Sequence, residues 1–387
     1  MPACPDAASP RPHANQLTEM LAARIRANGP ITFAEFMEAC LYHPQFGYYT
    51  RAEQPHMRDY YTSVDVHPIF GRLLARQLEE MWRITGRPDQ FWVVECGAGS
   101  GRLALHIVDF VARTFPDFAR AMRYVMVERS AARRSLTNAA QAMEHEPAAG
   151  PVATAREKMP ERIPVGCVLS NELVDALPVH RVMQREHGLQ ELFVGWQDGH
   201  FVDCELKPST PRLAEYFAAQ GIALPVGAQA EVSLAACDWI SRAGKALERG
   251  FVLTIDYGHE AQELYNERHM RGTLLAYHEH RATEDYYALP GQQDLTAHVN
   301  FTALDLFGRR AGLRRLGLVS QSHFLMALGA ANEFADLYHE GMSEAERVRA
   351  RLQLKNLIHP EGMGERFSVL VQTKGFEGAN LRGLQGF

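Results

Sequence analysis

The chain has 387 residues, of which 46% are hydrophobic and 22% are charged, and its formal net charge is −6. These values are typical of an ordinary globular protein and disfavour nucleic acid as a partner, and no apolar run reaches the roughly 18 residues of a membrane-spanning helix. The six cysteines are scattered without a C-x-x-C pair, which disfavours a zinc site or a disulfide framework and favours a reducing cytoplasm.

The first quarter of the chain is predicted to be mostly helical. Residues 1–15 are rich in proline and alanine but lack the apolar core of a signal peptide, so we expect a disordered lead. Apolar residues then recur at helical spacing in "QLTEMLAARIRANG", "TFAEFMEACLYHP" and "PIFGRLLARQLEEMW". An aromatic stretch without periodicity separates the last two segments. Residues 16–90 are therefore predicted to form an N-terminal helical lid with an aromatic loop.

After residue 90, short apolar strands alternate with helices. We predict strands at Phe91–Val94, Tyr124–Val127, Cys167–Leu169 and Phe251–Ile255, and helices that begin at Arg102 and near Ser130. This alternation is typical of an α/β fold with a doubly wound, mostly parallel sheet. Such sheets bind ligands at the carboxyl ends of their strands.

An insertion is predicted between the third and fourth of these strands. The segment "LQELFVGWQDGHFVDCEL" alternates apolar and polar residues around Asp198-Gly199, as a β-hairpin does, and "VSLAACDWISRAGKAL" follows as a helix. Near the C-terminus, "LGLVSQ" and "RFSVLVQTKG" are predicted strands with a helical stretch at 330–358 between them. The predicted divisions are the lid at 16–90, the core at 91–186 and 251–375, the insertion at 187–250 and a tail at 376–387.

A glycine-rich turn follows the first predicted strand. Its glycines are Gly97, Gly99 and Gly101, and the third glycine of a dinucleotide fingerprint is replaced by Arg102. The Gly-Lys-Ser/Thr of a phosphate-binding loop is also absent. What remains is a tight turn whose backbone can approach a ligand closely, because no Cβ stands in the way.

Two acidic residues at strand ends indicate which ligand this turn binds. Glu95 would repel a pyrophosphate but attract an amino group or a sulfonium, and Glu128 ends the next strand, where an acid commonly accepts the hydroxyls of a ribose. A ligand with a ribose, a cationic amino-acid part and no phosphate is S-adenosylmethionine. The alternative is that the glycines pack the helix against the strand and that Glu128 is a surface acid.

Six segments carry a resemblance that covers residues 31–375. They read "FMEACLYHPQFGYYT", "VVECGAGSGRL", "LSNELVDALPVHRV", "LTIDYG", "GQQDLTAHVNFTAL" and "GMGERFSVLVQTKG". In this order they resemble the MidA-like family of S-adenosylmethionine-dependent methyltransferases, which includes a mitochondrial complex I assembly factor that methylates an arginine. The resemblance implies a class I, Rossmann-like methyltransferase core. It also implies a protein substrate, such as a respiratory complex I subunit.

Polar residues after the third strand are candidates for the reaction itself. Asn171 and Glu172 follow the strand where the sheet opens onto its ligand, and Asp175 comes one turn later. We expect Asn171 to contact the cofactor, and Glu172 and Asp175 to hold the guanidinium of an arginine by charge-assisted hydrogen bonds. Alternatively, Asn171 caps a short helix and Asp175 is a solvated surface residue.

Three further positions are candidates for the substrate side. Asp256 and Tyr257 end the fourth strand, and the alternative for Asp256 is a cap of the following segment. In "DLTAHVNF", Asp294 is a candidate on the substrate side, and His298 is a candidate for proton removal. The alternative for His298 is a hydrogen-bonded structural role.

The aromatic loop is interpreted as a flap over the cofactor. We expect Thr62 or Ser63 to hydrogen-bond the cofactor's carboxylate end, although the loop's tyrosines could instead pin the N-terminal helices to the sheet. The predicted activity is methyl transfer from S-adenosylmethionine to a protein arginine, with no metal. Methylation of a small molecule and a cofactor-binding assembly chaperone without catalysis remain the alternatives.

Overall fold

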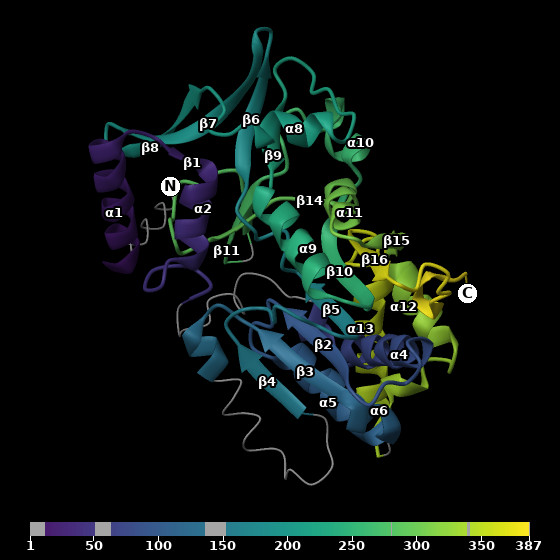
Figure 1. The fold of residues 1–387 in the computed structure, drawn as a ribbon. Coiled ribbons are helices and arrows are strands. Elements are labelled where there is room, and N and C mark those ends of the chain that lie inside the picture. Colours follow the sequence, from purple (N-terminus) through teal and green to yellow (C-terminus); the bar gives the residue numbers. More distant parts are fainter. Residues whose placement is uncertain (1–11, 51–62, 136–151, 280, 339–340, 387) are drawn as a thin grey trace.

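The computed structural model describes residues 12–50, 63–135, 152–279, 281–338 and 341–386, which form two lobes (Figure 1). Helix α1 spans Pro12–Asn28, so it begins inside the predicted disordered lead, whose first eleven residues lie outside the described part. Among the helices of the described residues, none is long and apolar enough to traverse a bilayer.

The larger lobe is built on a central sheet in the order β15-β16-β10-β5-β2-β3-β4. The strands are β2 Phe91–Cys96, β3 Met122–Val127, β4 Val152–Arg156, β5 Gly166–Asn171, β10 Gly250–His259, β15 Arg314–Ser320 and β16 Phe367–Lys374. The pairings of β4, β3, β2, β5 and β10 are parallel, and β16 runs antiparallel to both of its neighbours. The predicted doubly wound, mostly parallel sheet is confirmed. The edge strand β4 was not predicted, because its sequence "VATAR" is short and contains a single large apolar residue, Val152.

Helices cover both faces of this sheet. On one face, α4 Ile69–Ile84, α5 Arg102–Thr114, α6 Pro116–Ala121, α12 Gln321–Ala330 and α13 Glu344–Ile358 share a hydrophobic core with alternate residues of β2. On the other face, α9 Leu234–Ala246 and α11 Phe301–Arg310 pack against Val94 and Val168. Helix α9 was assigned to the insertion, but it is the crossover helix between β5 and β10, and its apolar side covers the sheet.

The smaller lobe collects segments from distant parts of the chain. Its sheet consists of β1 Ile31–Thr32, β6 His180–Arg185, β7 Gly188–Gln197, β8 His200–Leu206 and β9 Gln229–Val232. The hairpin predicted at Asp198-Gly199 is confirmed, since β7 pairs with β8 and both turn residues have positive φ. The predicted boundary at 187 is wrong, because β6 pairs with β7 and begins the insertion at His180.

The predicted lid at 16–90 divides between the two lobes. Helices α1 and α2 (Phe33–Tyr42) pack in the smaller lobe against Val194, Phe201 and the three-stranded sheet of β11 Leu275–His278, β12 Arg281–Thr283 and β13 Asp294–Thr296. Helix α4 instead belongs to the core of the larger lobe. The segment 275–296, which was predicted to be part of the core, therefore belongs to the smaller lobe. This assembly needs contacts that no local pattern in the sequence reveals.

The helical stretch predicted at 330–358 is an α-helix only from Glu344 onward, and a separate helix precedes it. Helix α12 ends at Ala330 and α13 begins at Ser343, its N-cap, with a short 3-10 helix (Ala335–Leu337) between them. Glu333 and Phe334 have φ values of 54° and 57°, which end the first helix. The predicted tail packs on the core, because Leu381 is buried and the backbone N–H of Gly383 donates to Gln77.

Candidate functional site

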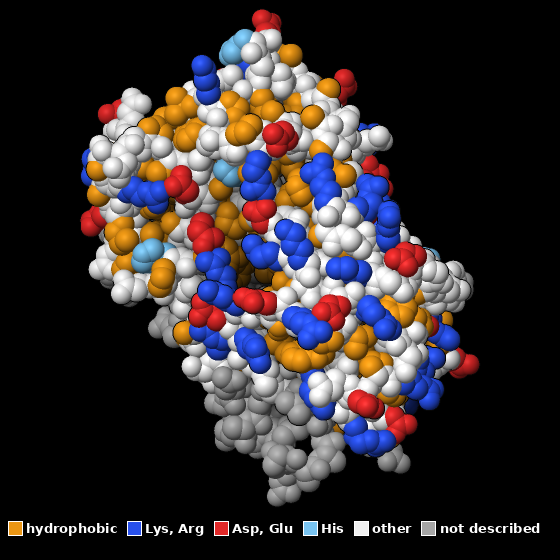
Figure 2. All heavy atoms as spheres, viewed as in Figure 1, with side chains coloured by type: hydrophobic (Ala, Val, Ile, Leu, Met, Phe, Trp, Pro, Cys, Tyr) orange, Lys and Arg blue, Asp and Glu red, His pale blue; other side chains and the backbone are white. Residues whose placement is uncertain are grey.

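A cleft of about 1260 Å³ opens over the carboxyl ends of the central strands (Figure 2). The register of the sheet creates it: Cys96 lies beside Val127, and Asn171 lies beside Ile255, so the residues that follow these strands meet at one edge. The glycine turn, Glu128, Asn171 and Glu172 all line this cleft, together with α9 and with Tyr42 and Tyr49 of the smaller lobe.

The glycine turn adopts a conformation that ordinary residues avoid. Gly97, Gly99 and Gly101 have φ values of 75°, 54° and 75°, and Gly101 is the N-cap of α5. A Cβ on Gly97 would lie 2.9 Å from the Leu173 side chain, whereas a Cβ on Gly99 would meet nothing closer than 3.9 Å. The turn therefore packs closely at Gly97 and leaves its backbone open to the cleft at Gly99.

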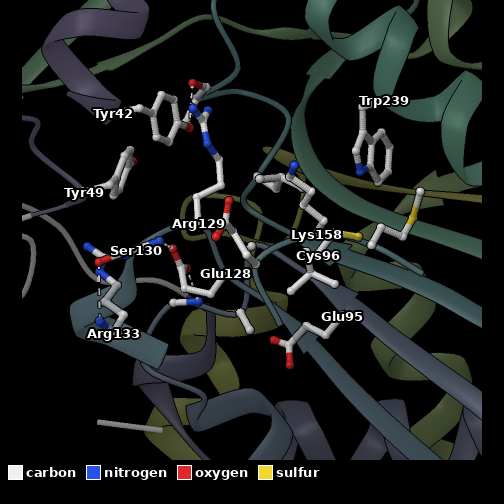
Figure 3. A pocket seen from close by; sticks show the side chains of 18 of the residues that line it. Tyr42, Tyr49, Glu95, Cys96, Glu128, Arg129, Ser130, Arg133, Lys158 and Trp239 are labelled. Carbon is white, nitrogen blue, oxygen red and sulfur yellow. Dashed lines mark hydrogen bonds between the residues drawn. The ribbon is translucent and has the colours of Figure 1, made fainter. Parts of the chain in front are cut away.

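Glu128 fastens the glycine turn to the loop after β3. Its carboxylate accepts the backbone N–H of Gly99 at 2.9 Å and that of Ser130 at 2.8 Å. Figure 3 shows its side chain among the residues that line the cleft. The carboxylate is thus held in place at the cleft wall, and it retains lone pairs that can accept further hydrogen bonds.

Glu95 lies deeper than Glu128. It is 4% exposed, and Figure 3 shows it directed away from Tyr42 and Tyr49. Burial raises the pKa of Glu95 to about 8, against which the Tyr124 hydroxyl, donating at 2.8 Å, has a smaller lowering effect. A cation that enters beside this carboxyl would favour its ionised form.

This pKa predicts a pH dependence of stability. Because the pKa of Glu95 is higher in the folded protein than its ordinary value of 4.5, the folded state holds a proton that the unfolded chain releases. The contribution of Glu95 is thus fully present below pH 4.5 and is lost as the pH rises through about 8. Between pH 4.5 and about 8, the free energy of unfolding should therefore fall less steeply with pH in Glu95→Gln than in the unchanged protein. Urea titrations at several pH values in this interval measure the difference. An unchanged slope would contradict the assignment.

Asn171 and Glu172 form a strained corner at the end of β5. Glu172 has a φ of 51°, and one carboxylate oxygen accepts hydrogen bonds from the Asn171 amide at 3.0 Å and from the Ser63 backbone at 2.9 Å. The Asn171 Oδ1 atom is buried in the cleft wall without a hydrogen-bond partner among the described residues. This oxygen is a ready acceptor for a donor group of a ligand.

The Ser63 side chain, one of the two predicted contacts of the cofactor's carboxylate end, does not line the cleft. Ser63 is fully buried, and its hydroxyl donates to Gln321 at 3.3 Å, away from the cleft. Its backbone rather than its side chain serves the site, through the hydrogen bond to Glu172. Thr62, the other predicted contact, lies outside the described residues.

Asp256 is a buried cap rather than a group on the cleft surface. One oxygen accepts the backbone N–H groups of Leu173, Val174 and Asp175 at 3.2, 2.8 and 3.4 Å, and the other accepts that of Tyr257 at 3.0 Å. The capping alternative therefore holds, although the capped segment follows β5 and not β10. Burial raises the pKa of Asp256 to about 7 despite these four donors.

Four carboxyl groups come together at the cleft wall, and we call them the acidic compartment: Glu172, which lines the cleft, and Asp175, Asp256 and Asp294, which do not. Burial raises the pKa of Asp175 well above its ordinary value, and the charges of the other three raise it further. Asp175 Oδ1 has no hydrogen-bond partner among the described residues, while Tyr257 hydrogen-bonds the carboxyl group. The Tyr49 hydroxyl, at 2.8 Å from both oxygens of Asp294, connects the compartment to the cleft.

His298 does not line the cleft. It lies against Tyr257 and His259, with ring centroids 5.3 and 5.4 Å away, and borders a separate small cavity lined by residues of both lobes. Burial, with smaller effects from His259 and His269, lowers the pKa of His298 to about 4. Its ring Nδ1 atom is buried without a hydrogen-bond partner among the described residues, so the structure supports neither proton removal in the cleft nor the hydrogen-bonded alternative for His298.

Sequence reasoning missed the cationic side of the cleft. The Arg129 guanidinium stacks 4.6 Å above the ring of Tyr42 and pairs with Glu38, and Arg133 lies 5.3 Å from the ring of Tyr49 (Figure 3). These contacts join the two lobes across the cleft. The spacing of the two arginines, one helical turn apart just after Glu128, was the available signal.

The cleft fits S-adenosylmethionine by the chemistry of its donors and acceptors. Glu128 offers acceptors for ribose hydroxyls beside a backbone turn without side chains, and the Asn171 Oδ1 atom and the buried Glu95 suit an ammonium group. The turn itself carries none of the lysines with which a phosphate-binding loop holds its ligand. The residues that would hold this cofactor are therefore Glu95, Gly97, Gly99, Glu128 and Asn171.

Comparisons with known proteins agree with this fit. The family described as "Putative S-adenosyl-L-methionine-dependent methyltransferase" matches residues 73–319. A protein from Burkholderia thailandensis, solved with S-adenosyl-homocysteine bound, is 30% identical with a TM-score of 0.85, over 98% of this chain and 97% of that chain. The protein arginine methyltransferase NDUFAF7 homolog of Drosophila melanogaster is 28% identical over 94% of this chain and 86% of its own length. Human mitochondrial NDUFAF7 is 26% identical over 92% and 84%. The chain belongs to this family of S-adenosyl-L-methionine-dependent methyltransferases.

Proposed function

We propose that the protein transfers a methyl group from S-adenosylmethionine to a guanidinium nitrogen of an arginine in a protein substrate. The observation that carries this proposal is the acidic compartment beside the cleft. Three of its four carboxyl groups are at most 7% exposed, and no Lys or Arg of the described residues forms an ion pair with Asp175 or Asp256. Buried carboxylates without a cation are costly, and a guanidinium that forms several hydrogen bonds at once offsets that cost. The names of the curated relatives, which are protein arginine methyltransferases, support the same substrate.

The residues of the chain would act by holding and deprotonating the guanidinium. Glu172, fixed by Asn171 and by the Ser63 backbone, and Asp175, through its Oδ1 atom, would accept hydrogen bonds from the substrate nitrogens. The cofactor, when bound, supplies an electrophilic methyl group at its sulfonium. As the new N–C bond forms and the S–C bond breaks, the nitrogen must lose one proton, and we assign its acceptance to Asp175, whose carboxyl group lies in the acidic compartment with the cleft-lining Glu172.

We infer two further properties, the substrate and the compartment. The family resemblance favours a respiratory complex I subunit as the substrate. The unpaired cysteines among the described residues favour a reducing compartment, and we propose the cytoplasm, although the curated relatives carry mitochondrial names.

Label transfer tests the proposed activity. The purified protein would be incubated with S-adenosylmethionine carrying a labelled methyl group and with lysate from source cells that lack this gene. A labelled protein that yields methylarginine on hydrolysis is the expected result. Label confined to small molecules would indicate that the substrate is a metabolite and not a protein. Absence of transfer despite measured cofactor binding would favour an assembly chaperone without catalysis.

A further inference from the structure

Three exposed cations stand at the rim of the cleft, and we call them the cationic lip: Lys158, Arg242 and Lys245. Arg242 and Lys245 lie three residues apart on the same side of α9, and Lys158 belongs to the loop that follows β4. All three line the cleft. Figure 2 shows Lys and Arg side chains gathered beside the hollow, over the position of α9 in Figure 1.

No cation of the lip forms an ion pair within the described part of the chain, although Glu157 and Glu161 line the cleft beside Lys158. Other cations near the cleft have partners: Arg129 pairs with Glu38, and Arg134 pairs with Glu157. Neither lysine of the lip nor Arg242 forms an ion pair among the described residues. Free cations on a chain with a net charge of −6 keep their attraction for an anion from outside.

The cleft thus presents opposite charges to one substrate. Its interior borders the acidic compartment, which attracts a cation, while the lip at its rim attracts anions and repels cations. A basic peptide that carries its arginine among lysines would be repelled at the lip. An arginine with acidic neighbours would satisfy both charges at once.

We propose that the cationic lip binds aspartate and glutamate side chains that flank the target arginine, so that the substrate is an arginine in an acidic protein segment. This inference rests on the proposed arginine methylation. A nucleic acid fits the lip less well, since three cations neutralise only a few phosphates and the carboxylates of the cleft would repel others.

Peptide binding tests the lip without requiring catalysis. Two short peptides would carry a central arginine, one flanked by Asp and Glu and the other by Asn and Gln, and their affinities would be measured by fluorescence anisotropy with S-adenosylhomocysteine present. The test variant is Arg242→Glu/Lys245→Glu. The control is Arg349→Glu/Lys355→Glu, which changes an exposed Arg and Lys on α13, away from the cleft, and alters the net charge equally.

We expect the acidic peptide to bind about tenfold more tightly than the neutral one, with a preference that weakens as salt is added. The preference should vanish in the Arg242→Glu/Lys245→Glu variant and persist in the control. Equal binding of both peptides, an unchanged preference in the variant, or tighter binding of an RNA oligonucleotide of equal charge would overturn the proposal. If the acidic peptide is preferred but neither peptide is methylated at arginine, the proposed function is wrong, while the binding of acidic side chains by the lip is supported.

Discussion

Replacement of Gly99 by asparagine is expected to weaken the binding of S-adenosylhomocysteine by about a hundredfold, equivalent to about 2.7 kcal/mol. Asparagine tolerates the left-handed conformation that Gly99 adopts at φ 54°, and a Cβ there has no neighbour closer than 3.9 Å. The protein should therefore fold. The new side chain, however, would fill the space through which the cofactor approaches the backbone. Calorimetry with the purified variant measures the loss.

Gly86→Asn is the matched control for this experiment. Gly86 also has a positive φ, 91°, with nothing within 4 Å of the position that a Cβ would occupy, and it lies in the turn before β2, away from the cleft. Its substitution should leave cofactor affinity unchanged. If Gly99→Asn binds the cofactor as tightly as the unchanged protein does, the glycine turn is not the cofactor site.

Asp175→Asn should reduce kcat/KM for methyl transfer by about a hundredfold or more, because it removes a proton acceptor and a ligand of the guanidinium. The same change should stabilise the fold by about 1 kcal/mol, since it removes one of four neighbouring buried carboxyl groups. The pKa of Asp175 is raised in the folded state, so its contribution to stability is lost as the pH rises. The advantage of the variant in urea titrations should therefore widen with increasing pH.

Glu231→Gln provides the control for Asp175→Asn. Glu231 is another buried carboxyl group with a raised pKa, but it lies in the smaller lobe and is not part of the acidic compartment. Its carboxylate accepts the backbone N–H of Thr273. Its substitution should leave methyl transfer unchanged. Full activity in Asp175→Asn, or a loss of stability there, would show that the acidic compartment does not work as we describe.

The central sheet and the cofactor side of the cleft were predictable because local signals encode them. The alternation of apolar strands with helices specifies the parallel sheet, and parallel strands bring their carboxyl ends to one edge. Glu95, Glu128 and Asn171 therefore meet at the glycine turn without further information. Each lies within a few residues of a strand that the sequence marks clearly.

The smaller lobe and the substrate side depend on contacts between distant segments. The Tyr49 hydroxyl donates to Asp294, which is 245 residues away in the sequence, and the Ser63 hydroxyl donates to Gln321, which is 258 residues away. Local sequence patterns could not predict either partner. His298 was misassigned for the same reason, because the structure places its ring against His259 of β10 and not in the cleft. The acidic compartment emerged only when β5, β10 and β13 were brought together.

The central claim, that the acidic compartment receives a guanidinium, is tested most directly with a peptide taken from the labelled substrate and a copy in which citrulline replaces the arginine. Citrulline keeps the shape of arginine but lacks its charge. Calorimetry in the presence of S-adenosylhomocysteine should give at least about tenfold tighter binding of the arginine peptide, and Asp175→Asn should reduce this difference. Equal affinities for the two peptides would contradict the account.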